Sequence, residues 1–113
     1  MEKSQWVQDF PASITVCDAK GVILEMNEGS VKEFENYGGL ALIGKSLLDC
    51  HNPASCAKLD AMLANEQPNV YTIQKNGKRK LVYQHPWYKD GMYAGFVEII
   101  LALPEEISQF NRD

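Results

Sequence analysis

The chain has no apolar run near the roughly 20 residues that a membrane-spanning helix needs, and its opening segment MEKSQWVQDF has no apolar secretory core. We therefore expect no membrane span. Cysteine is scarce, with three residues in no pairing pattern, which favours a reducing cytoplasm. An excess of positive charge is also missing, because the formal net charge is −4. This balance disfavours nucleic-acid binding, and we expect solvated charges in the basic hairpin-tip cluster of Lys75, Lys78, Arg79 and Lys80.

Motifs that would indicate an enzyme are absent as well. The segment GVILEMNEGS lacks the spacing and the terminal Lys-Ser/Thr of a phosphate-binding loop. No Ser-His-acid or Cys-His pair can be placed together from the sequence. We expect Glu25, Glu28, Glu33 and Glu35 to be solvated around a helix and not to form an acid–base pair. The sequence therefore predicts a protein that is not an enzyme.

The sequence does contain an ordered series of strands and short helices within 113 residues, a length that fits one domain. Residues 1–10 predict a short helix, which must pack against something to be stable. The β-rich runs 13–17 and 22–26 flank a turn and predict a first hairpin. Asn27 is typical of a helix N-cap, and Asn52 before Pro53 is typical of a second helix start.

Two tight-turn dipeptides divide the rest of the chain. Asn76-Gly77 and Asp90-Gly91 tolerate the positive φ angles of two-residue hairpin turns. Three consecutive antiparallel strands are therefore predicted after the helices.

This order of elements resembles the PAS domain family. The segments that carry the likeness are TVCDAKGVILEMNEGSVKEF, GKSLLDCHNP and YAGFVEIIL. Asp18, Gly21 and Asn27 match the family's "D…G.I…N" pattern, and Gly44 matches the glycine of its "LIGK" stretch. The likeness covers residues 12–103. The chain also resembles short stand-alone bacterial members with a Cys-His-x-Pro element, here CHNP at 50–53.

The resemblance implies an α+β protein with the PAS fold, in which short helices cover one face of a five-stranded antiparallel sheet. We expect an N-terminal helical cap over 1–11, the PAS domain over 12–103 and a C-terminal tail over 104–113. The ending after Pro104, which stops the last expected strand, favours a natural terminus over an excised domain.

The two tight turns also predict the register of the last three strands. With two-residue turns, Tyr71 faces Val82, Gln84 faces Val97, and Tyr83 faces Glu98. Side chains alternate between the faces of a strand, so one set should face the helices: Tyr71, Ile73, Val82, Gln84, Val97, Ile99 and Leu101. A one-residue bulge would exchange parts of the two sets.

The other face should be the outer one, and it carries large rings. Each aromatic ring can bury about 150–250 Å², so Tyr83, Trp87 and Phe96 exceed what monomers usually leave exposed. The N-terminal segment, the same face of a second subunit, or both should cover them, as the resemblance to PAS dimers implies. The alternative is a partly wet face. The expected dimer and cap face comprises Trp6, Phe10, Tyr83, Trp87, Phe96 and Glu98.

The helix-covered face raises the question of a ligand. A buried amide at Gln84 without a partner would cost about 1–3 kcal/mol. Tyr71, backbone, water or a bound molecule can satisfy it. In PAS proteins that bind flavin, the positions resembling Gln84 and Val97 face the cofactor. The expected ligand pocket comprises Phe34, His51, Leu59, Leu63, Tyr71, Ile73, Val82, Gln84 and Val97.

No cofactor is required by the sequence. The reactive-cysteine motif of flavin photosensors, an Asn-Cys-Arg-Phe run, is absent, so flavin photochemistry is not expected. Cys50 and Cys56 lack the spacing of a zinc site. Haem is a less favoured alternative, because some PAS sensors hold iron through a histidine in the region of His51.

We therefore expect a non-enzymatic cytoplasmic signalling module that binds a small molecule between helices and sheet. It would act as a homodimer or through contacts with a signalling effector protein. The alternatives are a dimerisation or docking module without a ligand, and a haem-binding sensor.

Overall fold

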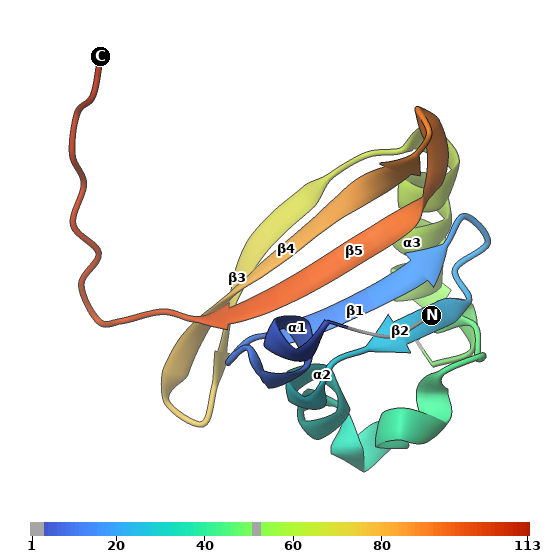
Figure 1. Cartoon of the computed structure of the whole chain (residues 1–113), viewed down its shortest axis with the longest axis horizontal. Coiled ribbons are helices and arrows are strands. Elements are labelled where there is room, and N and C mark those ends of the chain that lie inside the picture. The colour runs from blue at the N-terminus through green and yellow to red at the C-terminus, as the bar shows by residue number, and fades with distance from the viewer. Residues whose placement is uncertain (1–3, 51–52) are drawn as a thin grey trace.

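A computed structural model describes residues 4–50 and 53–113, with Cys50 described by its backbone alone. Figure 1 shows a strongly twisted sheet with short helices, and a C-terminal segment that extends away from it. The helices and strands follow in this order: α1 (Gln5–Asp9), β1 (Ser13–Asp18), β2 (Ile23–Met26), α2 (Glu28–Glu33), the 3-10 helices η1 (Glu35–Tyr37), η2 (Gly39–Leu42) and η3 (Leu47–Cys50), α3 (Pro53–Asn65), β3 (Asn69–Lys75), β4 (Lys78–Lys89) and β5 (Met92–Ala102).

The five strands form one antiparallel sheet in the order β2-β1-β5-β4-β3. Both predicted tight turns are confirmed, because Asn76, Gly77, Asp90 and Gly91 all take positive φ angles between 53° and 79°. These are the angles that a two-residue hairpin turn requires. The two hairpins therefore place β3, β4 and β5 side by side in chain order.

The predicted register of β3 and β4 is confirmed, since Tyr71 faces Val82. The predicted register of β4 and β5 is wrong beyond the turn. A bulge between Trp87 and Tyr88 shifts the pairing by one residue, so Gln84 faces Glu98 and Tyr83 faces Ile99. Every side chain of β5 after the bulge consequently points to the face opposite to the predicted one.

Gly95 explains why the strand is irregular here. Its φ angle is +143°, and a Cβ atom on it would collide with the main-chain oxygen of Cys17. Only a glycine allows β5 to approach β1 this closely. The close approach and the bulge together send Phe96, Glu98 and Ile100 to the inner face of the sheet.

The inner face is covered by α3 and the 3-10 helices, while α1 lies on the opposite side of the sheet (Figure 1). Two buried clusters join the sheet to its cover. One cluster comprises Cys17, Met62, Leu63 and Phe96, and connects β1 and β5 to α3. The other comprises Ile23, Met26 and Leu42. Leu47 packs against both clusters.

Among the described residues the N-terminal helix spans Gln5–Asp9, and Asn27 holds it. The Asn27 side chain is 2% exposed and caps α2 by accepting from the Ser30 amide at 2.9 Å, as expected of an N-cap. Its Oδ1 also accepts from the Ile14 amide, and its Nδ2 donates to the carbonyls of Val7 and Ala12, all at 2.9 Å. One side chain therefore ties α1, β1 and α2 together.

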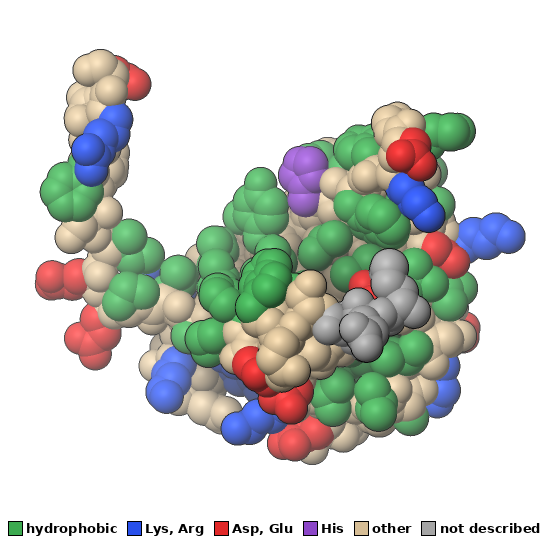
Figure 2. Space-filling model, in the orientation of Figure 1, with side chains coloured by type: hydrophobic (Ala, Val, Ile, Leu, Met, Phe, Trp, Pro, Cys, Tyr) green, Lys and Arg blue, Asp and Glu red, His purple; other side chains and the backbone are tan. Residues whose placement is uncertain are grey.

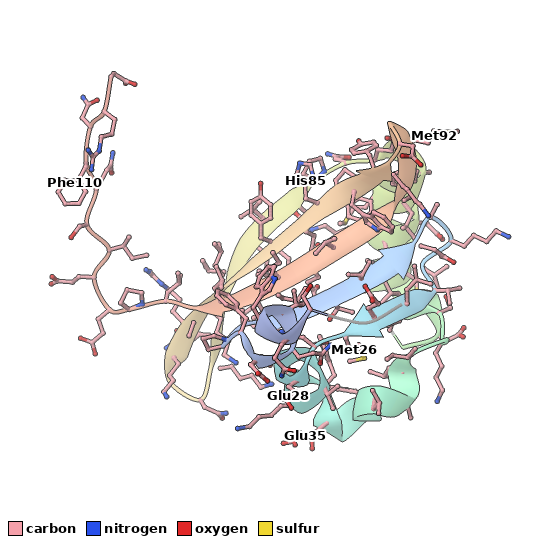
Figure 3. All side chains as sticks on the ribbon, in the orientation of Figure 1. Met26, Glu28, Glu35, His85, Met92 and Phe110 are labelled. Carbon is pink, nitrogen blue, oxygen red and sulfur yellow. The ribbon has the colours of Figure 1, made fainter. Side chains whose placement is uncertain are left out.

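The segment after β5 has no helix or strand, and Phe110 lies on it far from the sheet (Figure 3). Within the described part of the chain, no helix is both long and apolar enough to cross a membrane.

Candidate functional site

A cavity of about 420 Å³ lies between the inner face of the sheet and the helices. This volume is within the range typical of small-molecule sites. Both buried clusters contribute to its walls, and exposed residues such as Tyr37 and Lys75 line it as well, so the cavity reaches from the core to the surface. Seven of the residues predicted to line a pocket do line it: Phe34, Leu59, Leu63, Tyr71, Ile73, Val82 and Gln84.

The two remaining residues of the predicted pocket are not among the residues seen to line the cavity. Val97 does not line the cavity, because the bulge in the β4–β5 pairing turns it to the outer face. His51 falls outside the described residues.

Phe96 and Glu98 were predicted on the outer face, and this prediction is wrong for the same reason. Both line the cavity. Tyr83 and Trp87 lie on the outer face as predicted, since they alternate along β4 with Val82 and Gln84.

Gln84 finds its partners among protein side chains. Its Nε2 donates to Glu98 Oε2 at 2.7 Å, and its Oε1 accepts from Asn69 Nδ2 at 3.1 Å. Each of the three residues is partly buried. The amide predicted to need a partner is therefore held in one orientation against a wall of the cavity, between β3 and β5.

Burial and the nearby Glu98 shift the pKa values of two groups in the cavity lining, Tyr71 and Cys17. Burial raises the pKa of the Tyr71 hydroxyl, and the negative charge of Glu98 raises it further, while a hydrogen bond with Gln84 opposes the shift. Burial likewise raises the pKa of the Cys17 thiol, with smaller contributions from Asp18 and Glu98, against a hydrogen bond to the Phe96 backbone. Cys17 is thus a neutral thiol at neutral pH, which does not suit a nucleophile.

At one end of the cavity, an ion-pair cluster joins α2 to the β3–β4 hairpin. Glu33 lines the cavity and lies 3.0 Å from Lys75 Nζ and 2.8 Å from Lys80 Nζ. Burial alone would raise the pKa of Glu33, but the hydrogen bonds and charges of Lys80 and Lys75 outweigh it and lower the pKa. Glu33 and Lys80 were expected to be solvated, and this expectation is wrong because their paired side chains are only 11% and 24% exposed. Lys75 is 49% exposed although it is paired.

Other cavity residues were not predicted, although one signal in the sequence points to them. Thr15 and Cys17 alternate along the first predicted strand, so both must share a face, and both line the cavity. No comparable signal exists for Lys75, which was assigned to a solvated hairpin tip.

The described residues do not fit a haem or metal centre. The described part of the lining contains no histidine, and no group of three His, Cys, Asp or Glu that could hold a metal exists among the described residues. His85 projects from the outer face (Figure 3), where its ring stacks on Tyr83 with centroids 6.1 Å apart. A haem ligand at His51 remains a prediction.

The outer face is more apolar than predicted. Val97, Ile99 and Leu101 join Tyr83 and Trp87 there once the register is corrected. Figure 2 shows hydrophobic side chains gathered over this side of the sheet. Tyr83 is 41% exposed.

The N-terminal aromatics contact each other. The rings of Trp6 and Phe10 meet edge to face at 6.4 Å, and the two side chains are 68% and 45% exposed. This part of the expected dimer and cap face is therefore largely open in the single chain.

No protein-family model matches the chain, and no curated protein matches its sequence. Solved structures do match. The Aer2 receptor from Vibrio cholerae, described as a dual PAS-heme oxygen sensor, is 14% identical with a TM-score of 0.66, over 82% of this chain and 95% of that one. The PAS domain of BvgS from Bordetella pertussis is 18% identical with a TM-score of 0.63, over 88% of this chain and 82% of that one.

A sensory box sensor histidine kinase from Vibrio cholerae is 16% identical with a TM-score of 0.58, and the match covers 88% of each chain. At such identities the likeness concerns the fold alone. The five-stranded antiparallel sheet, its short helices and these structural matches agree: the chain has the PAS fold.

Proposed function

We propose that this protein is a non-enzymatic sensory module that binds a small molecule in the cavity between the sheet and the helices. The observation that carries the proposal is a cavity in the core whose wall holds Gln84 and Glu98 in a fixed hydrogen-bonded geometry. Apolar walls with a few oriented polar groups are what small-molecule sites use to bind and orient a ligand.

Two connections can pass ligand binding to the rest of the molecule. Glu33 joins the cavity to the β3–β4 hairpin through Lys75 and Lys80. Asn27, at the start of α2, joins that helix to α1. A ligand that binds better to one arrangement of α2 than to another shifts the balance between the two arrangements, and α1 responds.

The output surface in this proposal is the outer face with the exposed rings of α1. A second copy of the chain would cover Val97, Ile99 and Tyr83, giving a homodimer. A signalling effector protein would bind at α1 with an affinity that depends on the arrangement of this helix. Cys17 and Cys56 are thiols and not disulfides, which suits a reducing cytoplasm.

A second candidate function is a dimerisation or docking module without a ligand. The apolar outer face favours it, because a module of this kind needs only that surface. A haem sensor is a lesser candidate that depends on His51.

Native mass spectrometry of protein purified from its own source tests the proposal. A bound molecule retained under gentle conditions and lost on unfolding supports the sensory module, and a thermal-shift increase on adding that molecule back confirms specific binding. Protein that carries no molecule, and whose melting temperature no small-molecule library raises, supports the docking module. A Soret band after haem reconstitution, lost in His51→Ala, would indicate the haem sensor.

A further inference from the structure

The mouth of the cavity can be located from the exposure of the residues that line it. Of the described lining residues, Tyr37, Tyr71 and Lys75 are exposed, and the others are buried or half-buried. Tyr37 belongs to η1, whereas Tyr71 and Lys75 lie on β3, which is an edge strand of the sheet. The cavity therefore opens between the helices that cover the sheet and the β3 edge.

Two side-chain contacts cross this mouth, one from α2 and one from α3. Glu33 of α2 accepts a hydrogen bond from Lys75 of β3, with 3.0 Å between the carboxylate oxygen and Nζ. Lys58 of α3 lies over the Tyr71 ring, with its Nζ 6.0 Å from the ring centre. Each contact joins the helical cover to the edge strand through a lysine side chain. Exposed side chains change rotamer quickly, so these contacts can open without any change in the backbone.

The two lysines that bind Glu33 are not equivalent. Lys75 lines the cavity and its side chain is 49% exposed, whereas Lys80 is not part of the lining and is 24% exposed. The Glu33 side chain itself is only 11% exposed. An ion pair with a half-exposed lysine is weak, because water and salt compete with it. Lys75 can therefore leave Glu33 readily, while Lys80 keeps the carboxylate in place.

Lys75 also interacts with other groups on the helical side of the mouth. The hydrogen bond to Glu33 and the charge of Glu33 raise the pKa of the Lys75 ammonium, and smaller contributions from Tyr37 and Glu35 add to the shift. These three residues belong to α2 and η1, whereas Lys75 belongs to β3. The paired lysine therefore reaches across the mouth and narrows it.

Building on the proposed ligand cavity, we propose that the Glu33–Lys75 ion pair is a gate that controls how fast a ligand enters and leaves. The ligand passes between Tyr37 and Tyr71 when Lys75 swings away from Glu33, and the mouth closes when the pair forms again. The pair forms whether or not the cavity holds a ligand. It consequently acts on the rates of binding and release, and it has little effect on the affinity of an uncharged ligand.

The neutral probe 5-fluoroindole tests the gate, because it can enter the cavity without forming an ion pair with Lys75 or Glu33. Fluorine NMR measures its dissociation constant by titration and its rate of release from the line shape. The methyl signals of Val82, a buried residue of the lining, report whether the probe occupies the cavity.

Three variants are compared with the wild type: Lys75→Met, Lys75→Arg and the control Lys80→Met. Both methionine variants keep an unbranched apolar side chain and remove one of the two ion pairs of Glu33. They differ in position, because Lys75 lines the cavity and Lys80 does not. The control therefore separates the loss of an ion pair from the loss of the gate.

Lys75→Met should raise the rates of binding and release together by about two- to fivefold, because a half-exposed ion pair holds the lysine weakly. The dissociation constant should stay within about 1.5-fold, since it is the ratio of two rates that change alike. Lys75→Arg should slow both rates by about two- to fivefold, because a guanidinium can hold a carboxylate through two hydrogen bonds. Lys80→Met should leave both rates within about 1.5-fold of the wild type.

The contrary results are distinct. Equal rates in the wild type and Lys75→Met overturn the gate, and so do rates that rise as much in Lys80→Met as in Lys75→Met. A dissociation constant that changes in Lys75→Met by as much as the rate of release also overturns it, because Lys75 then contacts the ligand. In each of these cases the Val82 signals still shift, so the proposed ligand cavity stands. No shift of the Val82 signals contradicts the ligand cavity and the gate together.

Melting curves check that the variants fold. If a variant does not fold, the salt dependence of the wild type decides. Raising NaCl to about 1 M shortens the screening length to about 3 Å, so it should weaken the Glu33–Lys75 pair and speed both binding and release of the neutral probe. Rates that this salt leaves unchanged overturn the gate.

Discussion

At the scale of single residues, Gln84 and Asn27 hold the molecule together through side-chain amides. Both amides bond to main-chain or side-chain groups on more than one element. In a side-chain amide the nitrogen only donates hydrogen bonds and the oxygen only accepts them. Each of these two amides is therefore fixed in one orientation by its partners. Substitutions that keep the size of the side chain but change its hydrogen-bond donors and acceptors therefore test these bonds.

Gln84→Leu should destabilise the fold by about 1–3 kcal/mol, because it removes the hydrogen bonds to Asn69 and Glu98 from a partly buried site. It should also weaken binding of the cavity ligand. Chemical denaturation measures the first effect. Gln74→Leu, on an exposed position of the neighbouring strand β3, is the control and should change stability by less than about 0.5 kcal/mol. Equal stability of the two variants would show that the Gln84 bonds are unimportant.

Asn27→Asp should release α1. The aspartate keeps both acceptor bonds to Ile14 and Ser30 but replaces a donor with an oxygen that faces the carbonyls of Val7 and Ala12. We expect a loss of about 1–3 kcal/mol and faster hydrogen exchange over α1. Asn36→Asp, at an exposed site in η1, should leave exchange in α1 unchanged. Unchanged exchange in Asn27→Asp would contradict the role of Asn27 as the link.

At the scale of elements, the link between α2 and the β3–β4 hairpin should depend on pH. The pKa of Glu33 is lower in the folded chain than its ordinary value of 4.5. The ion pairs therefore add stability at pH values above about 4.5, and this stability is lost as the pH falls through the lowered folded value.

Glu33→Gln should therefore cost about 1 kcal/mol at pH 7, in keeping with a small cluster of surface ion pairs. The difference from the wild type should shrink as the pH falls below 4.5. Denaturant melts at a series of pH values measure it, with Glu35→Gln, which is exposed nearby, as control. A difference that stays constant across this range would show that the ion pairs do not stabilise the link.

Element by element, the sequence predicts the fold well where local chemistry decides it. The two tight turns depend on Asn76-Gly77 and Asp90-Gly91, and the α2 cap depends on Asn27, so both are visible in the sequence. The register between β4 and β5 cannot be predicted from the sequence in this way. It depends on how closely Gly95 approaches the backbone of Cys17, which lies far from it in the chain, and no local pattern encodes such a contact.

The same bulge limited the prediction of the site. Pocket residues on β3, β4 and the helices could be predicted because they precede the shift, whereas Val97, Phe96 and Glu98 follow it. The Glu33 ion pairs were missed because they join α2 to a hairpin about 42 residues later in the chain. Charge patterns in the sequence do not show which distant groups will meet.

At the scale of the whole molecule, the corrected register separates the core from the association surface. Val97→Asp should keep the monomer folded and weaken the proposed dimer by at least about tenfold, because the dimer would bury a charge from each copy. Ile100→Asp should instead unfold the chain, since Ile100 is 7% exposed on the inner face. Sedimentation velocity and melting curves distinguish the two effects, with Ile107→Asp in the C-terminal segment as control. Unfolding by Val97→Asp would support the register first predicted from the sequence.

An electron-density map of the protein purified from its own source tests the central claim most directly. We expect density for a small molecule between the sheet and α3, beside Gln84, with Val97 on the opposite surface. Side chains that close this space completely, or a β5 strand that turns Val97 toward α3 in place of Glu98, would contradict the account.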